Sequence, residues 1–181
     1  MLSITIPATE LWDETRCEFI PVKEQTLRLE HSLVSLSKWE SKHQKSFISN
    51  KDKTTEEVID YIKCMTITQN VDPIVYQCLS RENVDAINEY IAMPMTAVYF
   101  PEDKNGNKTS GDKVTSELIY YWMITQNIPF ECEKWHLNKL IALIRVCSMK
   151  NAPQKSMSKG DIYSKNRALN AARRKQHNTK G

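Results

Sequence analysis

The spacing of apolar residues changes at Ser32, and this change constrains the fold more than any other feature of the 181-residue chain. Before it, apolar and polar residues alternate over Leu2–Ile6 and again over Thr26–Glu30, the two-residue period of half-buried strands. Between them, Phe19–Val22 is a third strand candidate, whose proline confines it to a sheet edge. We therefore expect residues 1–30 to form a small antiparallel sheet of two or three strands.

From Ser32 onward the apolar residues recur every three or four positions, which predicts helices. Helix start signals stand at Ser32, Thr54 with Glu57, Asp72-Pro73, Ser80 and Thr115. We expect a mainly α fold, in which about five helices of residues 31–150 pack with the sheet as one unit. The expected core includes Leu36, Trp39, Ile62, Ile87, Trp122, Trp135 and Leu140. The predicted helix that begins at Thr115 contains Leu118–Ile124 and is apolar around most of its circumference, which is typical of a central helix.

A short motif occurs twice at the ends of predicted helices. Ile67–Val71 and Ile124–Ile128 both contain Ile-Thr-Gln-Asn before an apolar residue. Asparagine tolerates the left-handed conformation that often ends a helix, so both segments are predicted helix stops. Duplication of a helical unit would explain the echo, but the flanking residues align only with a gap. Convergent capping is therefore the preferred interpretation.

The charge is unevenly divided along the chain. Residues 1–150 carry 17 Lys and Arg against 21 Asp and Glu, whereas residues 151–181 carry eight basic residues and only Asp161 as an acid. We expect 151–181 to be a basic tail, flexible or conditionally helical, that is dispensable for folding but needed for partner engagement. The candidate partner-binding cations are Lys165, Arg167, Arg173, Arg174 and Lys175. Docking on an acidic protein surface, weak non-specific attraction to nucleic acid, and a merely solubilising role all stay open; specific nucleic-acid recognition is not expected.

The motifs of common catalytic sites are absent from the sequence. It has no nucleophile elbow, Walker A, HExxH, EF-hand or GxGxxG pattern. Cys132 and His136 are four residues apart on a predicted helix, but two ligands do not make a zinc site. The simpler expectation is a buried Cys132 and a partly exposed His136, with His31 standing alone in a polar setting. We expect no metal, no cofactor and no enzymatic activity.

Trp12 is the candidate anchor for a protein partner. It lies in Glu10–Glu14, which is expected to be a short acidic turn, where burial of an indole is less assured than in a helix. The alternative is that Trp12 folds back onto the sheet.

The remaining composition points to a reducing compartment without a membrane. The five cysteines show no paired spacing, which indicates reduced thiols. No apolar run approaches the roughly 20 residues of a membrane span, and the N-terminal residues lack the features of a signal peptide. The expected location is therefore a cytosol.

Six segments of the chain resemble one protein family. They are Leu29–Ser41, Tyr61–Thr68, Ile119–Met123, Ile128–Cys132, Trp135–Leu140 and Leu169–Arg174. Together they make nearly the whole chain similar to the tail assembly chaperones of long-tailed, siphovirus-type bacteriophages. Such chaperones have no defining active-site residues, so the resemblance carries over no site.

The resemblance implies a non-enzymatic role in virion assembly. The protein would bind the long, aggregation-prone tape-measure protein in the host cytoplasm and help tail-tube subunits assemble around it. It would leave before the virion is complete. The alternative is a structural virion component, such as a tail or connector subunit. Self-association, the host and any longer frameshifted form stay open.

Overall fold

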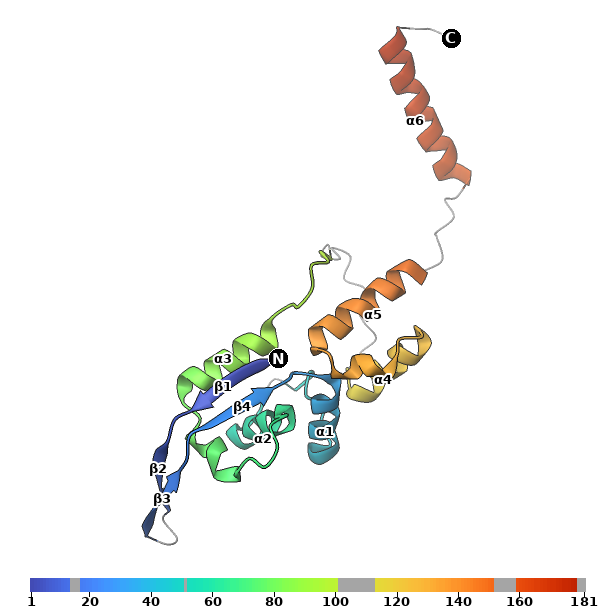
Figure 1. The fold of residues 1–181 in the computed structure, drawn as a ribbon. Coiled ribbons are helices and arrows are strands. Elements are labelled where there is room, and N and C mark those ends of the chain that lie inside the picture. The colour runs from blue at the N-terminus through green and yellow to red at the C-terminus, as the bar shows by residue number, and fades with distance from the viewer. Residues whose placement is uncertain (14–16, 51, 101–112, 152–158, 179–181) are drawn as a thin grey trace. The chain divides into compact units, whose positions relative to one another are not determined.

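The computed structural model describes residues 1–13, 17–50, 52–100, 113–151 and 159–178 (Figure 1). It divides into two compact units, Met1–Ser148 and Met149–Gly181. The fold is mainly α with a small N-terminal antiparallel β element, as the periodicity predicts. Within the described ranges no helix has both the length and the apolarity that a membrane crossing requires.

Four short strands form the N-terminal β element. Strand β1 (Leu2–Ile6) pairs antiparallel with β4 (Gln25–Leu29), and β2 (Thr9–Asp13) pairs antiparallel with β3 (Glu18–Val22). Only two residues separate β1 from β2 and β3 from β4, so the second pair continues the first as a ribbon (Figure 1).

The strand β2 corrects the predicted acidic turn around Trp12. Leu11 lies opposite Ile20, and both are half-buried, whereas Trp12 and Phe19 are exposed. This alternation has the two-residue period of a strand. It is hard to recognise in the sequence because acidic residues flank Leu11 and Trp12. Pro21 is accepted in β3 because each strand of a two-stranded ribbon has an outer edge where no backbone N–H is needed.

The helices of the first unit begin close to their predicted caps. They are α1 (Leu33–His43), α2 (Thr55–Met65), the 3-10 helix η1 (Pro73–Cys78), α3 (Arg81–Ala92), α4 (Ser116–Thr125), the 3-10 helix η2 (Phe130–Lys134) and α5 (Leu137–Asn151), whose last three residues belong to the second unit. Thr54 and Glu57 form the predicted capping box, and Thr115 accepts a hydrogen bond from the Leu118 N–H.

The two Ile-Thr-Gln-Asn segments have different structures. Asn127 is left-handed, with φ of 52°, and the Ile128 N–H donates to the Met123 carbonyl at 2.9 Å, which ends α4 as predicted. Asn70 is also left-handed, with φ of 56°, but α2 already ends at Met65. The prediction of a helix stop at Asn70 is therefore wrong. Residues 66–68 leave the helix early because they hydrogen-bond to β4, where the Ile67 N–H donates to the Arg28 carbonyl at 2.8 Å.

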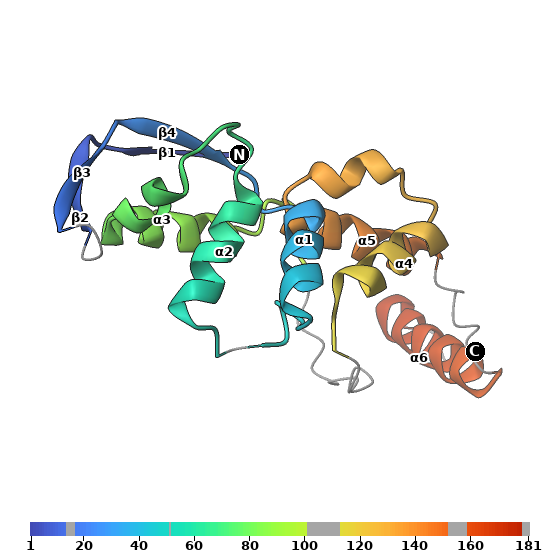
Figure 2. The ribbon, with the colours of Figure 1, turned by 90° about the horizontal axis from the view of Figure 1, so that it is seen from below.

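Two apolar clusters make up the core of the first unit. The first joins the ribbon to α2, η1 and α3, which lie on one face of the ribbon (Figure 2). The second joins α1, α4, η2 and α5. Helix α1 contributes to both, since Trp39 belongs to the first cluster and Leu33 and Leu36 belong to the second.

Most of the expected core residues are buried. Leu36, Trp39, Ile62, Ile87 and Leu140 are at most 2% exposed. Trp122 is only partly buried against the second cluster, and Trp135 is 39% exposed, so its prediction as a core residue is wrong. Trp135 follows η2 directly rather than lying inside α5, and this places its indole at the surface beside Lys139.

Candidate partner-binding surfaces

The outer face of the β2–β3 hairpin carries an exposed aromatic pair. Trp12 lies opposite Phe19, and their ring centroids are 4.9 Å apart in an edge-on arrangement. The two side chains are 48% and 63% exposed. Glu10 and Pro21 also lie opposite each other and are exposed on the same face. We call these four residues the hairpin face.

The other half of the ribbon shows that an outer face need not be aromatic. On β1 and β4 the exposed positions are Ser3, Thr5, Thr26 and Arg28, and the hydroxyls of Thr5 and Thr26 lie 3.1 Å apart. These polar residues suit a solvated ribbon. The pattern changes at β2 and β3, where large apolar groups replace them, and exposed clusters of this kind often mark interaction sites.

A second apolar surface lies on α4 and η2. Tyr121 and Ile124 are 60% and 59% exposed, and their spacing of three residues places them on one side of the helix. Phe130 is 56% exposed, and its ring lies 6.4 Å from that of Tyr120, one helical turn before Ile124. We call Tyr120, Tyr121, Ile124 and Phe130 the α4 patch.

The α4 patch corrects the expectation of a central helix. Only one side of α4, with Ile119 and Met123, is buried in the core. Tyr120 is fixed at the edge of the patch because its hydroxyl donates to Glu133 at 2.8 Å. Burial and this contact with Glu133 raise the pKa of Tyr120 to about 12, so the phenol keeps its proton. The sequence signal was present, since an apolar helix of ten residues has more apolar surface than one core-facing side can bury.

The second unit contains α6 (Lys159–His177), which carries all five predicted cations. Lys165, Arg167, Arg173, Arg174 and Lys175 are exposed. Arg167 and Arg174 are seven residues apart and share one side of the helix with Tyr163 and Asn170. The other three cations point to other sides, so the helix brings together only two of the five.

The histidines correct a further expectation from the sequence. His31 and His136 are 4% and 6% exposed, and their ring centroids are 5.1 Å apart. Tyr61 Oη lies 2.6 Å from His31 Nδ1. His136 Nδ1 accepts from the Asn138 N–H, so Nε2 carries the proton that it donates to the Tyr90 carbonyl at 3.0 Å. Neither histidine is a solitary surface residue.

The histidine pair lies where the segment that follows β4 contacts the start of α5. Burial, followed by the proximity of His136, lowers the pKa of His31 to about 4, and burial also lowers the pKa of His136. Both rings are therefore neutral at pH 7. The Leu137 N–H donates to the His31 carbonyl at 2.7 Å, next to the bridge between Ser32 and His136. Cys132 is buried as expected, and among the described residues no three His, Cys, Asp or Glu side chains form a metal-binding group.

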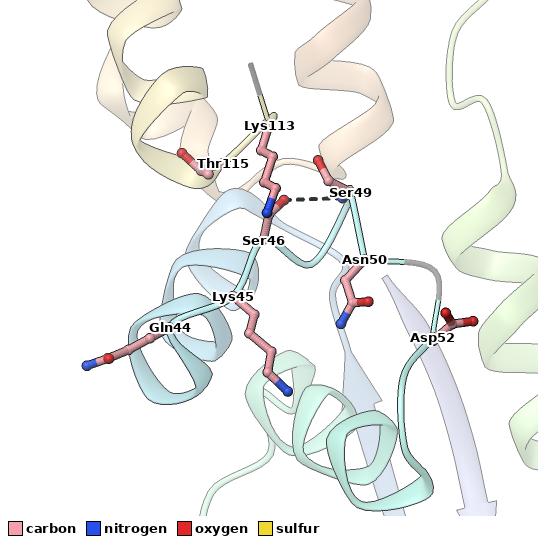
Figure 3. Close-up of a pocket in the computed structure, with 8 residues that line it drawn as sticks. All are labelled: Gln44, Lys45, Ser46, Ser49, Asn50, Asp52, Lys113 and Thr115. Carbon is pink, nitrogen blue, oxygen red and sulfur yellow. Dashed lines mark hydrogen bonds between the residues drawn. The ribbon is translucent and has the colours of Figure 1, made fainter. Parts of the chain in front are cut away.

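A polar pocket of about 660 Å³ lies between the end of α1 and the start of α4 (Figure 3). Its lining residues include Lys45, Ser46, Ser49, Lys113 and Thr115. Lys45 is paired with Glu57 at 2.7 Å, and the Ser46 hydroxyl accepts from the Ser49 N–H and donates to the Val114 carbonyl. These contacts tie the segment after α1 to its neighbours.

Comparisons of the chain with protein-family models, with curated proteins and with solved structures find no match.

Sequence reasoning singled out Trp12 but missed its neighbour Phe19 and the α4 patch. The sequence predicts Phe19 in an edge strand, but the face on which its ring lies depends on the partner strand. Counting back from the strand Glu18–Val22 across a short connection would have paired it with Thr9–Asp13 and placed both rings on one face.

Proposed function

We propose that the protein is a non-enzymatic tail assembly chaperone of a long-tailed bacteriophage. It binds the tape-measure protein in the host cytoplasm, helps tail-tube subunits assemble around it, and is left out of the finished virion. The proposal starts from the six resembling segments of the sequence. The α4 patch is the structural observation that carries it, because a chaperone needs accessible apolar surface and no catalytic chemistry.

The α4 patch suits an elongated, amphipathic helical client. Its exposed side chains come from one helix and the adjoining η2, so they offer a narrow row rather than a deep pocket. A client helix can lay its apolar stripe along such a row. A few aromatic anchors supply most of the binding energy in interfaces of this kind, which leaves the affinity modest enough for release.

The basic helix α6 gives the protein a second means of engaging partners. Its cations are exposed and would attract acidic segments over about 10 Å at roughly 0.1 M salt. A folded unit with an apolar patch and a separate basic helix can therefore engage two proteins, the tape-measure protein and the tail-tube protein.

Co-expression with the tape-measure protein of the same phage tests this function. We expect the wild-type chain to keep the tape-measure protein soluble and to co-purify with it. The double variant Tyr121→Ser, Ile124→Ser should lose most of this effect, since it removes the two most exposed side chains of the patch. Val98→Ser, Tyr99→Ser is the matched control, because these side chains are 47% and 84% exposed outside the patch.

Purified virions distinguish the chaperone from a structural subunit. A chaperone should be missing from particles and present in the infected cell during assembly. Stoichiometric copies in the particle, found by quantitative mass spectrometry, would replace the proposal with a tail or connector role. If the Tyr121→Ser, Ile124→Ser variant and its control co-purified equally with the tape-measure protein, the α4 patch would not be the client-binding surface.

A further inference from the structure

The hairpin face and helix α6 have complementary chemistry. We propose that the hairpin face of one copy of this chain binds α6 of a second copy. Two copies that exchange their α6 helices in this way form a symmetric dimer with two identical contacts.

The hairpin face provides an aromatic surface beside one exposed carboxylate, that of Glu10. Trp12 and Phe19 expose about half or more of their side chains, and Glu10 lies two residues before Trp12 on the same face. On the opposite face, Leu11 of β2 and Val22 of β3 pack in the first core cluster, so the hairpin face is turned outward.

Helix α6 provides the matching cations. Tyr163, Arg167, Asn170 and Arg174 share one side of the helix and cover nearly three of its turns. A guanidinium group stacks on an indole or phenyl face and can simultaneously form a two-point contact with a carboxylate. One arginine can therefore bind Trp12 while the other binds Glu10.

The chain already uses such contacts between cations and rings inside its first unit. Lys139 Nζ lies 4.5 Å from the ring centroid of Trp135, and the Arg145 guanidinium carbon lies 4.4 Å from that of Phe100. In both cases the aromatic ring is near the surface and the cation shields one of its faces. The same contact between copies would shield Trp12.

Because each copy binds α6 of the other, two weak contacts together can hold a dimer. Each contact joins exposed charges to a single aromatic pair and is weak by itself. Formation of the first contact makes the second intramolecular, which raises its effective concentration to about the millimolar range. Closed two-fold dimers are the commonest symmetric assemblies of soluble proteins.

The test measures the mass of the purified full-length chain against concentration, by sedimentation velocity at 50 mM and 500 mM NaCl. We expect a reversible monomer–dimer equilibrium that weakens at high salt, because exposed charges are screened. The double variant Arg167→Glu, Arg174→Glu should weaken dimerisation about tenfold or more. Lys38→Glu, Lys134→Glu is the matched control, since it makes the same change of net charge at two exposed body positions and should leave dimerisation unchanged.

A mixing experiment identifies the two halves of the contact. Trp12→Ser, Phe19→Ser should also be largely monomeric, and Glu10→Lys provides a milder variant that leaves the aromatic pair in place. A 1:1 mixture of the hairpin variant and the α6 variant keeps one intact hairpin face and one intact α6. Their heterodimer has one of the two contacts and lacks the gain in effective concentration, so we expect it to be weaker than the wild-type dimer but detectable at about 1 mM, where neither variant alone associates.

Three results would overturn the inference. They are a wild-type chain that stays monomeric up to about 1 mM, a dimer that both double variants leave intact, and a mixture that forms no heterodimer. If the wild-type chain dimerises but the mixture forms no heterodimer, the dimer contact joins the same surface of both copies. Since no client is present, these outcomes are independent of the chaperone proposal.

Discussion

The carboxylate of Glu40 is buried where the end of α1 meets the start of α4. Its Oε1 accepts from the Phe47 N–H at 2.9 Å and its Oε2 accepts from the Ser116 N–H at 2.7 Å. The residue is 7% exposed. Two backbone donors far apart in sequence thus depend on one side chain, which fixes the segment after α1 against the first turn of α4.

We expect Glu40→Gln to lower the free energy of unfolding by about 2–3 kcal/mol. An amide has one acceptor oxygen, so its NH₂ group would face a backbone N–H that the carboxylate now satisfies. Urea denaturation at pH 7 measures the change. Glu89→Gln on the exposed side of α3 is the control and should shift it by less than about 0.5 kcal/mol. Similar stability of both variants would show that the Glu40 contacts contribute little.

The neutral histidine pair predicts a loss of stability at mildly acidic pH. The pKa of His31 falls from 6.5 to about 4 on folding, so the unfolded chain binds more protons between these values. Stability is therefore fully retained above about pH 6.5 and decreases as the pH falls toward 4, by up to about 3 kcal/mol for His31. His136 adds a contribution of the same sign.

Denaturation series at pH 7.5, 6.5, 5.5 and 5 measure this slope. The range lies above the titration of Glu57 and Asp60, whose pKa values are lowered by Lys45 and Lys42. His31→Asn should flatten the slope even if it lowers stability at every pH. His177→Gln, on exposed α6, should keep the wild-type slope. An unchanged slope in the His31 variant would place the acid sensitivity elsewhere.

At the scale of elements, local signals are strong where a side chain acts on its own turn. The capping box of α2 and the Asp72-Pro73 start of η1 are readable from the sequence because donor and acceptor are two or three residues apart. The early end of α2 depends on β4, more than thirty residues earlier in the chain, and no local pattern encodes it. The joining of His31 to His136 is likewise a product of packing.

The same reasoning explains why the candidate surfaces were only partly predictable. Trp12 is unusual in its sequence surroundings, but its exposure follows from the register of β2 with β3. The exposed side of α4 follows from which neighbours pack on it. Sequence patterns give the amount of apolar surface on an element, and tertiary packing decides how much of that surface is left uncovered.

The capping box of α2 should contribute measurably to the free energy of unfolding. Thr54 Oγ1 accepts from the Glu57 N–H at 3.2 Å, while Glu57 Oε2 accepts from the Thr54 N–H at 3.0 Å. Thr54→Ala removes the first bond, and we expect a loss of about 1 kcal/mol in the free energy of unfolding. Thr55→Ala, one residue further and exposed, is the control in the same thermal melts. Equal melting temperatures would mean that packing alone holds the start of α2.

At the scale of the whole molecule, the core of the fold lies in the first unit. The apolar clusters and the buried hydrogen bonds lie within Met1–Ser148, whereas the described side chains of α6 are exposed. The hairpin face belongs to the side of the first cluster and the α4 patch to the side of the second. The client of the proposed function and the second copy of the proposed dimer would therefore contact different faces of the first unit.

Deletion of residues 152–181 tests separately whether these residues are needed for folding and for dimerisation. The apolar side chains of α6 are few and exposed, with Ile162 44%, Leu169 48% and Tyr163 78% accessible, and the first unit has two core clusters of its own. We expect the truncated chain to keep the melting temperature of the full chain within about 2 °C. It should also lose the salt-dependent dimer, because each copy would lack the helix that its partner binds. Calorimetry and sedimentation on the same preparation measure both effects. Unfolding of the truncated chain would show that the C-terminal residues are structural, and a folded truncated chain that still dimerises would move the self-association to the first unit.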